Sequence, residues 1–241
     1  MISPQSFERP HHRRVAHLLT LLDGERLRGL QCWFGGGTAL VLRGGEYRES
    51  LDVDFLVSDH HGYRALREAL TGPDGALALL PPDQVLVRQI RDVRADQYGI
   101  RTMLAVDDLP IKFEIIREAR IVLDVPSADD AIAGVATLTA VDLLAEKLLA
   151  NADRWADDGL FSRDVLDIAM AEPTTTRLRR AIEKSEDAYG SAIRADLEKA
   201  IAALMERHDR LERCLAVLQF SEPRAVVWKR LRQLRRMAAQ L

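Results

Sequence analysis

Two aspartates on one face of a short strand have the residue type and spacing that most clearly indicate chemistry. The segment 51–57 (LDVDFLV) alternates, so its apolar residues face a core while Asp52 and Asp54 project together from the other face. Carboxylates held this close repel each other and lose hydration unless a cation compensates them. Two Mg²⁺ ions about 4 Å apart could activate an attacking oxygen and stabilise a leaving one. The pair therefore predicts a two-metal site. An edge strand whose aspartates simply face water is the alternative.

A glycine-rich segment upstream strengthens the metal-site interpretation. Residues 35–38 (GGGT) stand between an expected strand and an expected helix. Glycines at such a junction expose backbone N–H groups, and the helix N-terminus adds a favourable dipole, so the two together bind phosphate. A glycine run alone is more often just a turn.

A further strand offers a third acid. In residues 110–116 (PIKFEII), Lys112 and Glu114 share the face opposite the apolar side chains. An acid between Phe113 and Ile115 is costly without a partner, so Glu114 is expected as the third metal ligand. Lys112 beside it could contact phosphate. A surface strand with a polar Lys/Glu face is the alternative.

The elements that position these residues follow from periodicity and turn signals. Helices are expected at 11–22, 38–42 and 61–70, and strands at 31–34, 51–57, 84–90, 97–106 and 110–117, the last two joined by a turn at 107–108. Beyond Pro126, helical patterns dominate, near 139–153, 161–170, 175–184, 191–208, 209–219 and 223–239. The sequence therefore predicts an α+β chain with a mixed-sheet domain at 1–130 and a helical domain at 131–241.

Composition excludes some classes of protein. No run approaches the roughly 18 apolar residues that a membrane helix needs, and residues 1–14 lack the apolar core of a secretory signal. Cys32 and Cys214 are expected as buried thiols, and the histidines, which lack metal-ligand spacing, as exposed. Residues 173–241 carry 15 Lys+Arg against 9 Asp+Glu. This basic tail could bind a polyanion, and a solvated helix face is the alternative.

The glycine segment and the aspartate pair together resemble the motif of a known family. GGTAL (36–40) followed by Arg48-x-Ser50-x-Asp52-x-Asp54-Phe55 resembles the signature of the DNA polymerase beta nucleotidyltransferase superfamily. More narrowly, it is similar to the AbiEii-type nucleotidyltransferase toxins of bacterial toxin–antitoxin and abortive-infection systems and their mycobacterial MenT relatives. The segments 143–150 (LLAEKLLA) and 161–168 (FSRDVLDI) support the narrower resemblance, which covers roughly residues 33–170. Departures are a third glycine, Glu as the third acid, and Leu166 where Tyr is typical.

The resemblance implies a polymerase-beta-like fold and a set of site residues, taken by position. Expected to bind nucleotide are Gly36, Gly37, Thr38, Arg48, Ser50, Lys112 and Lys147. Expected in catalysis are Asp52, Asp54, Glu114, Lys147 and Asp164, of which Asp52, Asp54 and Glu114 bind the metal. By spacing alone, Lys147 could instead be an ordinary exposed helix lysine, and Arg163, Asp164 and Asp167 a surface ion-pair cluster.

The reaction implied is transfer of a nucleoside monophosphate from an NTP to an acceptor hydroxyl, with release of pyrophosphate. The resemblance implies an RNA acceptor, with the 3′ end of tRNA as one candidate, a cognate antitoxin as partner, and a cytoplasmic protein without membrane association. Two alternatives stay open. One is a small-molecule nucleotidyltransferase of the aminoglycoside-modifying type, which predicts an acidic cleft. The other is a non-enzymatic scaffold that keeps the fold and binds a partner.

Overall fold

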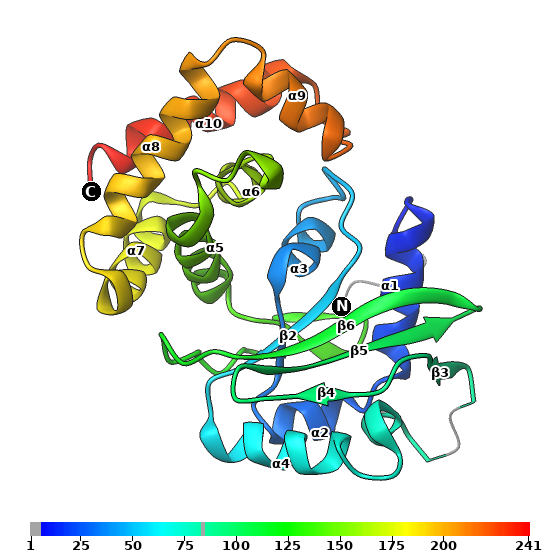
Figure 1. The fold of residues 1–241 in the computed structure, drawn as a ribbon. Coiled ribbons are helices and arrows are strands. Elements are labelled where there is room, and N and C mark those ends of the chain that lie inside the picture. The colour runs from blue at the N-terminus through cyan, green and yellow to red at the C-terminus, as the bar shows by residue number, and fades with distance from the viewer. Residues whose placement is uncertain (1–5, 83–84) are drawn as a thin grey trace. The chain divides into compact units, whose positions relative to one another are not determined.

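The computed structural model describes residues 6–82 and 85–241, which fall into two compact units (Figure 1). The first unit comprises the chain up to Arg43 and Ser50–Thr139, and the second comprises Gly44–Glu49 and Ala140–Leu241. This division differs from the sequence-predicted boundary after residue 130. The first unit extends further because Leu138 N donates a hydrogen bond to Phe34 O, which ties the segment before residue 140 to a strand near the N-terminus.

A mixed β-sheet organises the first unit. Its strands run in the order β1–β2–β6–β5–β3, with β4 paired to β5; β2 and β6 are parallel and the other pairs antiparallel. The strands are β1 (Trp33–Phe34), β2 (Val53–Val57), β3 (Val87–Gln89), β4 (Arg94–Ala95), β5 (Gly99–Val106) and β6 (Leu109–Arg117), and a separate ribbon pairs β7 (Ala131–Ile132) with β8 (Val135–Ala136). The expected strand at 84–90 is present as β3, and Gln84 lies outside the described residues.

Alternation along the strands explains which face of the sheet is buried. Phe55 on β2 packs against Phe34 on β1 and Phe113 on β6, with ring centroids 5.6 Å apart in both pairs. Between β5 and β6, Asp107 and Asp108 adopt positive φ values of 51° and 60°. Such a two-residue turn matches the twist of a hairpin, and aspartate tolerates this conformation. The expected 107–108 turn is thereby confirmed.

The helices of the first unit are α1 (Pro10–Leu21), α2 (Gly24–Gly29), α3 (Gly36–Arg43) and α4 (His60–Leu70), with a 3₁₀ turn η2 (Gly75–Leu79). Figure 1 shows α2 and α4 beside the sheet on the same side. The sequence did not predict α2, because glycines at both of its ends suggested a loop. Its first turn is held by Asp23, whose side chain accepts a hydrogen bond from Arg26 N.

The second unit is helical. It contains α5 (Ala140–Arg154), the 3₁₀ turn η3 (Asp158–Leu160), α6 (Arg163–Met170), α7 (Thr175–Tyr189), α8 (Ala192–Glu206), α9 (Arg210–Val217) and α10 (Arg224–Ala238). Helix α5 packs against α6, α7 and α8, and α10 packs against α6 and α8. A mixed-sheet unit followed by helices confirms the α+β prediction.

Two further expectations from composition can be compared with the structure. Cys32 and Cys214 are buried free thiols, and burial raises the pKa of Cys32 well above its ordinary value. Among the helices of the described residues, none is long and apolar enough to cross a membrane.

Candidate active site

The three predicted metal-binding acids come together on one face of β2 and β6. Asp54 and Glu114 are partners in the parallel pairing of these strands. Asp52 immediately precedes β2 and falls on the same face by alternation. Side-chain exposure is 44% for Asp52 and 15% for Glu114, so the acids border solvent without being fully exposed. Their roles as metal ligands stay a prediction, whereas their adjacency is an observation.

Lys112 supplies a positive charge inside this acidic group. Its Nζ lies 2.7 Å from Glu114 Oε2 and 3.8 Å from Asp52 Oδ2. Partial burial lowers the pKa of Lys112, but the hydrogen bond to Glu114 and the attraction of Asp52 outweigh it and raise this pKa above its ordinary value. Arg101 Nε is also 3.3 Å from Glu114 Oε1. Two protein cations therefore compensate Glu114.

The donor chemistry fits a divalent cation, although the side chains are gathered around Lys112. Within residues 6–82 and 85–241, no three His, Cys, Asp or Glu side chains are placed to hold a metal ion. Three carboxylates on adjacent strands are nevertheless the oxygen donors that Mg²⁺ prefers. Gly36 also cradles Asp54: its φ is +67°, and a Cβ there would lie 2.5 Å from Asp54 Oδ2. Only glycine permits this close approach.

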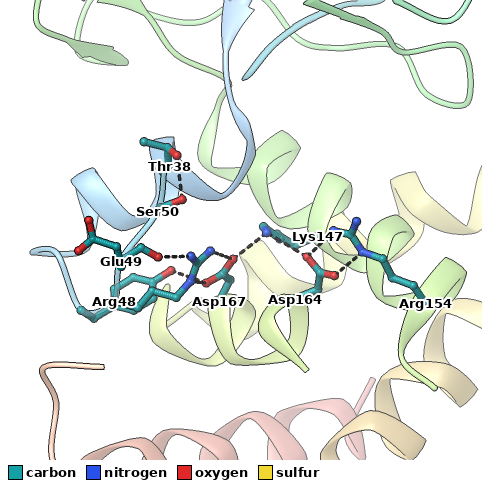
Figure 2. Close-up of polar contacts among 9 residues, drawn as sticks. Thr38, Arg48, Glu49, Ser50, Lys147, Arg154, Asp164 and Asp167 are labelled. Carbon is teal, nitrogen blue, oxygen red and sulfur yellow. Dashed lines mark hydrogen bonds and ion pairs between the residues drawn. The ribbon is translucent and has the colours of Figure 1, made fainter. Parts of the chain in front are cut away.

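The glycine segment and Thr38 hold the chain that leads into β2. Gly35 N donates a hydrogen bond to Asp54 O at 2.8 Å, and Thr38 Oγ1 donates to Asp52 O at 2.5 Å. The Ser50 hydroxyl lies 2.8 Å from Thr38 Oγ1 (Figure 2). A hydroxyl has one proton to donate, and that of Thr38 is directed to Asp52. In this structure Thr38 therefore holds the chain that leads into β2, and phosphate binding by the N–H groups that open α3 stays a prediction.

Helix α1 adds a contact that sequence reasoning missed. His12 was expected to be exposed and is instead completely buried, with Nε2 accepting a hydrogen bond from Ser50 N at 3.2 Å. His11 Nε2 donates to Leu51 O at 2.9 Å. His12 is buried because it shares a helix face with Val15 and Leu19, which are also buried. That spacing could have indicated its burial.

In the second unit, Asp167 is the centre of a buried ionic cluster (Figure 2). Arg48 binds it in a bidentate manner, with Nε–Oδ1 at 2.7 Å and Nη2–Oδ2 at 2.8 Å. Lys147 Nζ is 2.7 Å from Asp167 Oδ2, and Tyr47 donates its hydroxyl to Oδ1 at 2.9 Å. Arg48, expected to bind nucleotide, is thus engaged by an aspartate that was not among the predicted site residues.

Lys147 links this aspartate to a second one. Its Nζ lies 3.0 Å from Asp164 Oδ1, and Arg154 holds the other Asp164 oxygen at 2.8 Å (Figure 2). Lys147 is 6% exposed and Asp164 4%. The alternatives of an ordinary exposed lysine and a surface ion-pair cluster are both wrong, because the lysine and both aspartates are buried. Direct contact of Lys147 with nucleotide stays a prediction.

The buried ionic cluster makes the stability of the second unit depend on pH. Burial by itself would raise the pKa of Asp164, but Lys147 and Arg154 outweigh it and hold this pKa well below its ordinary value. For Asp167, Arg48 and Lys147 likewise overcome burial and lower the pKa. Unfolded aspartates titrate near about pH 3.9. Because the folded pKa values are depressed, the stabilisation is complete above that pH and is lost as pH falls through the folded values.

We therefore expect the melting temperature to fall between about pH 4 and pH 2, with Asp167→Asn weakening this dependence. Parallel thermal melts of parent and variant across this range measure it. Identical pH dependence in the two proteins would show that Asp167 is not coupled to the cations as described.

Helix α10 carries most of the basic tail. Val227, Leu231 and Leu234 are buried, leaving the cations outside. Arg224 pairs with Glu212, and Arg230 pairs with Glu172. Arg232, Arg235 and Arg236 are exposed. This arrangement is that of a solvated amphipathic helix, and binding of a polyanion there stays a prediction.

Two solved structures are similar to this chain over nearly its whole length. A candidate nucleotidyltransferase from Helicobacter pylori is 14% identical, with 97% of this chain and 95% of that chain covered and a TM-score of 0.48. The protein JHP933 from Helicobacter pylori is 16% identical, with 98% and 93% covered and a TM-score of 0.48. Among curated proteins there is no match.

The family comparison is more specific. The model of the family described as nucleotidyl transferase AbiEii toxin, type IV toxin–antitoxin system, matches residues 20–234. This range includes the carboxylate strands, the glycine segment and the buried cluster of Lys147, Asp164 and Asp167, and it confirms the resemblance found in the sequence. The chain therefore belongs to the AbiEii nucleotidyl transferase toxin family.

Proposed function

We propose that this protein is a Mg²⁺-dependent nucleotidyltransferase that transfers a nucleoside monophosphate from an NTP to a hydroxyl of RNA, with the 3′ end of tRNA as the first acceptor to test. The observation that carries the proposal is the register of β2 and β6, which makes Asp54 and Glu114 neighbours and places Asp52 on the same face. Three oxygen donors on one sheet face suit Mg²⁺ and a triphosphate.

Asp52, Asp54 and Glu114 would hold two Mg²⁺ ions. Bound there, the ions would neutralise the triphosphate and stabilise the departing pyrophosphate. The acceptor oxygen bonds to the α-phosphorus as the bond between that phosphorus and the β-phosphate oxygen breaks. Glu114 takes the hydroxyl proton, and pyrophosphate leaves with the electron pair of the broken bond. Asp52 and Asp54, acting through the bound ions, would keep the triphosphate in place during this exchange.

Other residues position the nucleotide. The backbone N–H groups of Gly36 and Gly37 open α3 and bind phosphate oxygens. The ammonium group of Lys112 lies 3.8 Å from Asp52. When the carboxylates hold metal, this ammonium group contacts the triphosphate instead of Asp52. Thr38 and Ser50 keep the entry to β2 in place through their mutual contact. Arg48, Lys147 and Asp164 are proposed to be required for transfer because they occupy the family's motif positions.

Labelling identifies the substrates. Full-length protein is incubated with Mg²⁺ and each α-³²P NTP in turn, with and without bulk RNA. We expect label in RNA, only with Mg²⁺, and with a preference among the NTPs. Label that appears in an added aminoglycoside instead would favour the small-molecule enzyme, and no labelled acceptor with any NTP would favour a non-enzymatic role.

The family belongs to type IV toxin–antitoxin systems. We propose that a cognate antitoxin protein is a partner of this chain, and that transfer takes place in the cytoplasm, where NTPs and RNA are available. Growth inhibition on expression, relieved by the antitoxin and absent from an Asp54 variant, is the expected cellular result.

A further inference from the structure

A cavity of about 770 Å³ opens on the sheet of the first unit, beside the carboxylates. Its lining contains four cationic side chains, Arg91, Arg94, Arg101 and Lys112, against two acids, Asp92 and Glu114. Lys112 and Glu114 also belong to the candidate metal site, so the cavity and the site share a wall. The cavity is therefore placed to hold a molecule that reacts there.

Strand register fixes the order of charges across this sheet face. Glu114 on β6 is directly opposite Arg101 on β5, and Arg101 is directly opposite Arg94 on β4. Residues opposite each other in antiparallel pairs point to the same face. With Asp54 beside Glu114 on β2, the sheet carries Asp54, Glu114, Arg101 and Arg94 in sequence. Acids thus give way to cations along a single surface.

The outer cations are the ones available to a ligand. Arg101 is paired with Asp96, at 3.2 Å, and with Glu114. Arg91 and Arg94 are exposed, and neither guanidinium has an ion-pair partner in the part of the chain that the structure describes. Unpaired guanidinium groups lining a cavity favour a phosphate-bearing ligand. They disfavour a polycation such as an aminoglycoside.

The position of the glycine segment indicates which substrate this ligand is. Gly36 and Gly37 open α3 just after β1, which pairs with β2 on the side away from β6. In the proposed function, on which this inference rests, the NTP phosphates bind there. The cavity lies on the opposite flank of the carboxylates, beyond β6. We propose that this cavity binds phosphodiester groups of the acceptor, with Arg91 and Arg94 as the contacts that hold an RNA strand next to its reacting hydroxyl.

Charge reversal tests this assignment. Full-length Arg91→Glu/Arg94→Glu protein is titrated against a short fluorescein-labelled single-stranded oligoribonucleotide, with anisotropy read at several salt concentrations and no NTP present. We expect affinity to fall by roughly tenfold or more at low salt. The log–log salt slope should also shrink by about 1.4, since each neutralised phosphate contributes about 0.7 for single strands. The thermal shift produced by Mg²⁺ and NTP should match that of the parent.

A matched control carries the same charge change elsewhere on the first unit. Arg64→Glu/Arg67→Glu alters two exposed arginines of α4 that do not line the cavity. It should bind the oligonucleotide nearly as the parent does. Similar losses in both double variants would mean that only net charge matters, which contradicts a specific subsite.

Two other results would also overturn the proposal. Unchanged RNA affinity in Arg91→Glu/Arg94→Glu would exclude the cavity, and the exposed α10 arginines would become the next surface to reverse. Loss of the NTP-induced thermal shift would assign the cavity to the nucleotide. The proposed function fails separately. If the parent binds the oligonucleotide through this cavity but transfers nucleotide to no RNA, only the proposed function is contradicted. If the parent transfers nucleotide to RNA and Arg91→Glu/Arg94→Glu does so equally well, only the cavity's role in binding RNA is contradicted.

Discussion

Replacing Asp54 by asparagine should reduce transfer by about a thousandfold or more while leaving the protein folded. Loss of a metal-binding carboxylate removes several kcal/mol of transition-state stabilisation, and about 4 kcal/mol corresponds to about a thousandfold in rate. Asparagine has the same shape, so it fits against Gly36, whose backbone approaches the Asp54 side chain closely. Removing one of several neighbouring negative charges also relieves repulsion. Single-turnover transfer assays and thermal melts measure the two effects.

Asp108→Asn is the matched control, because Asp108 lies in the turn that leads into β6 and asparagine tolerates its positive φ. This variant should keep the activity of the parent. Mg²⁺ with NTP should raise the melting temperature of the parent but not that of Asp54→Asn. Near-parental transfer by Asp54→Asn would remove the carboxylate pair from the mechanism.

Asp167→Ala should destabilise the second unit by about 3–5 kcal/mol, which is the usual cost of leaving buried charges without their partner. Arg48 would lose both of its hydrogen bonds to Asp167, and Lys147 would keep only Asp164. The hydroxyl of Tyr47 would lose its acceptor as well. Urea unfolding monitored by circular dichroism gives the change in free energy.

The control for this prediction is Asp187→Ala, an exposed aspartate on α7 of the same unit. Its substitution should change stability by no more than about 0.5 kcal/mol. If Asp167→Ala were no more damaging than this control, the cluster would contribute nothing to stability, and its aspartates would have to be explained by function alone.

Local patterns explain why much of the first unit was predictable from sequence. The alternation of 51–57 identified β2 and the face of Asp52 and Asp54, and the Asp107-Asp108 turn identified the β5–β6 hairpin. Each depends on residues that are close in the sequence. Strand β6 and the side of Glu114 followed in the same way.

What could not be predicted depends on pairs distant in the sequence. The order of strands in the sheet makes Asp54 a neighbour of Glu114 and places Lys112 between acids. Periodicity does not encode that order. The pairing of Arg48 with Asp167 joins residues 119 positions apart. No local signal indicates it, so the sequence predicted nucleotide binding for Arg48 and did not place Asp167 in the site.

Helix α2 was not predicted from the sequence for a different reason. Glycine usually ends helices, so Gly24 and Gly29 suggested a loop, yet α2 runs between them. Asp23 at the N-cap and Glu25 in the first turn were the counter-signals. For a helix this short, capping and the surrounding fold outweigh composition.

The fate of the two ends of the NTP shows whether the carboxylates of β2 and β6 serve nucleotidyl transfer. Parallel reactions contain the same NTP labelled with ³²P at either the α- or the γ-phosphate, together with Mg²⁺ and RNA. We expect RNA to acquire the α-label, the γ-label to be released as pyrophosphate, and Asp54→Asn to abolish both. Transfer of the γ-label to RNA, or α-labelling that persists in Asp54→Asn, would contradict it.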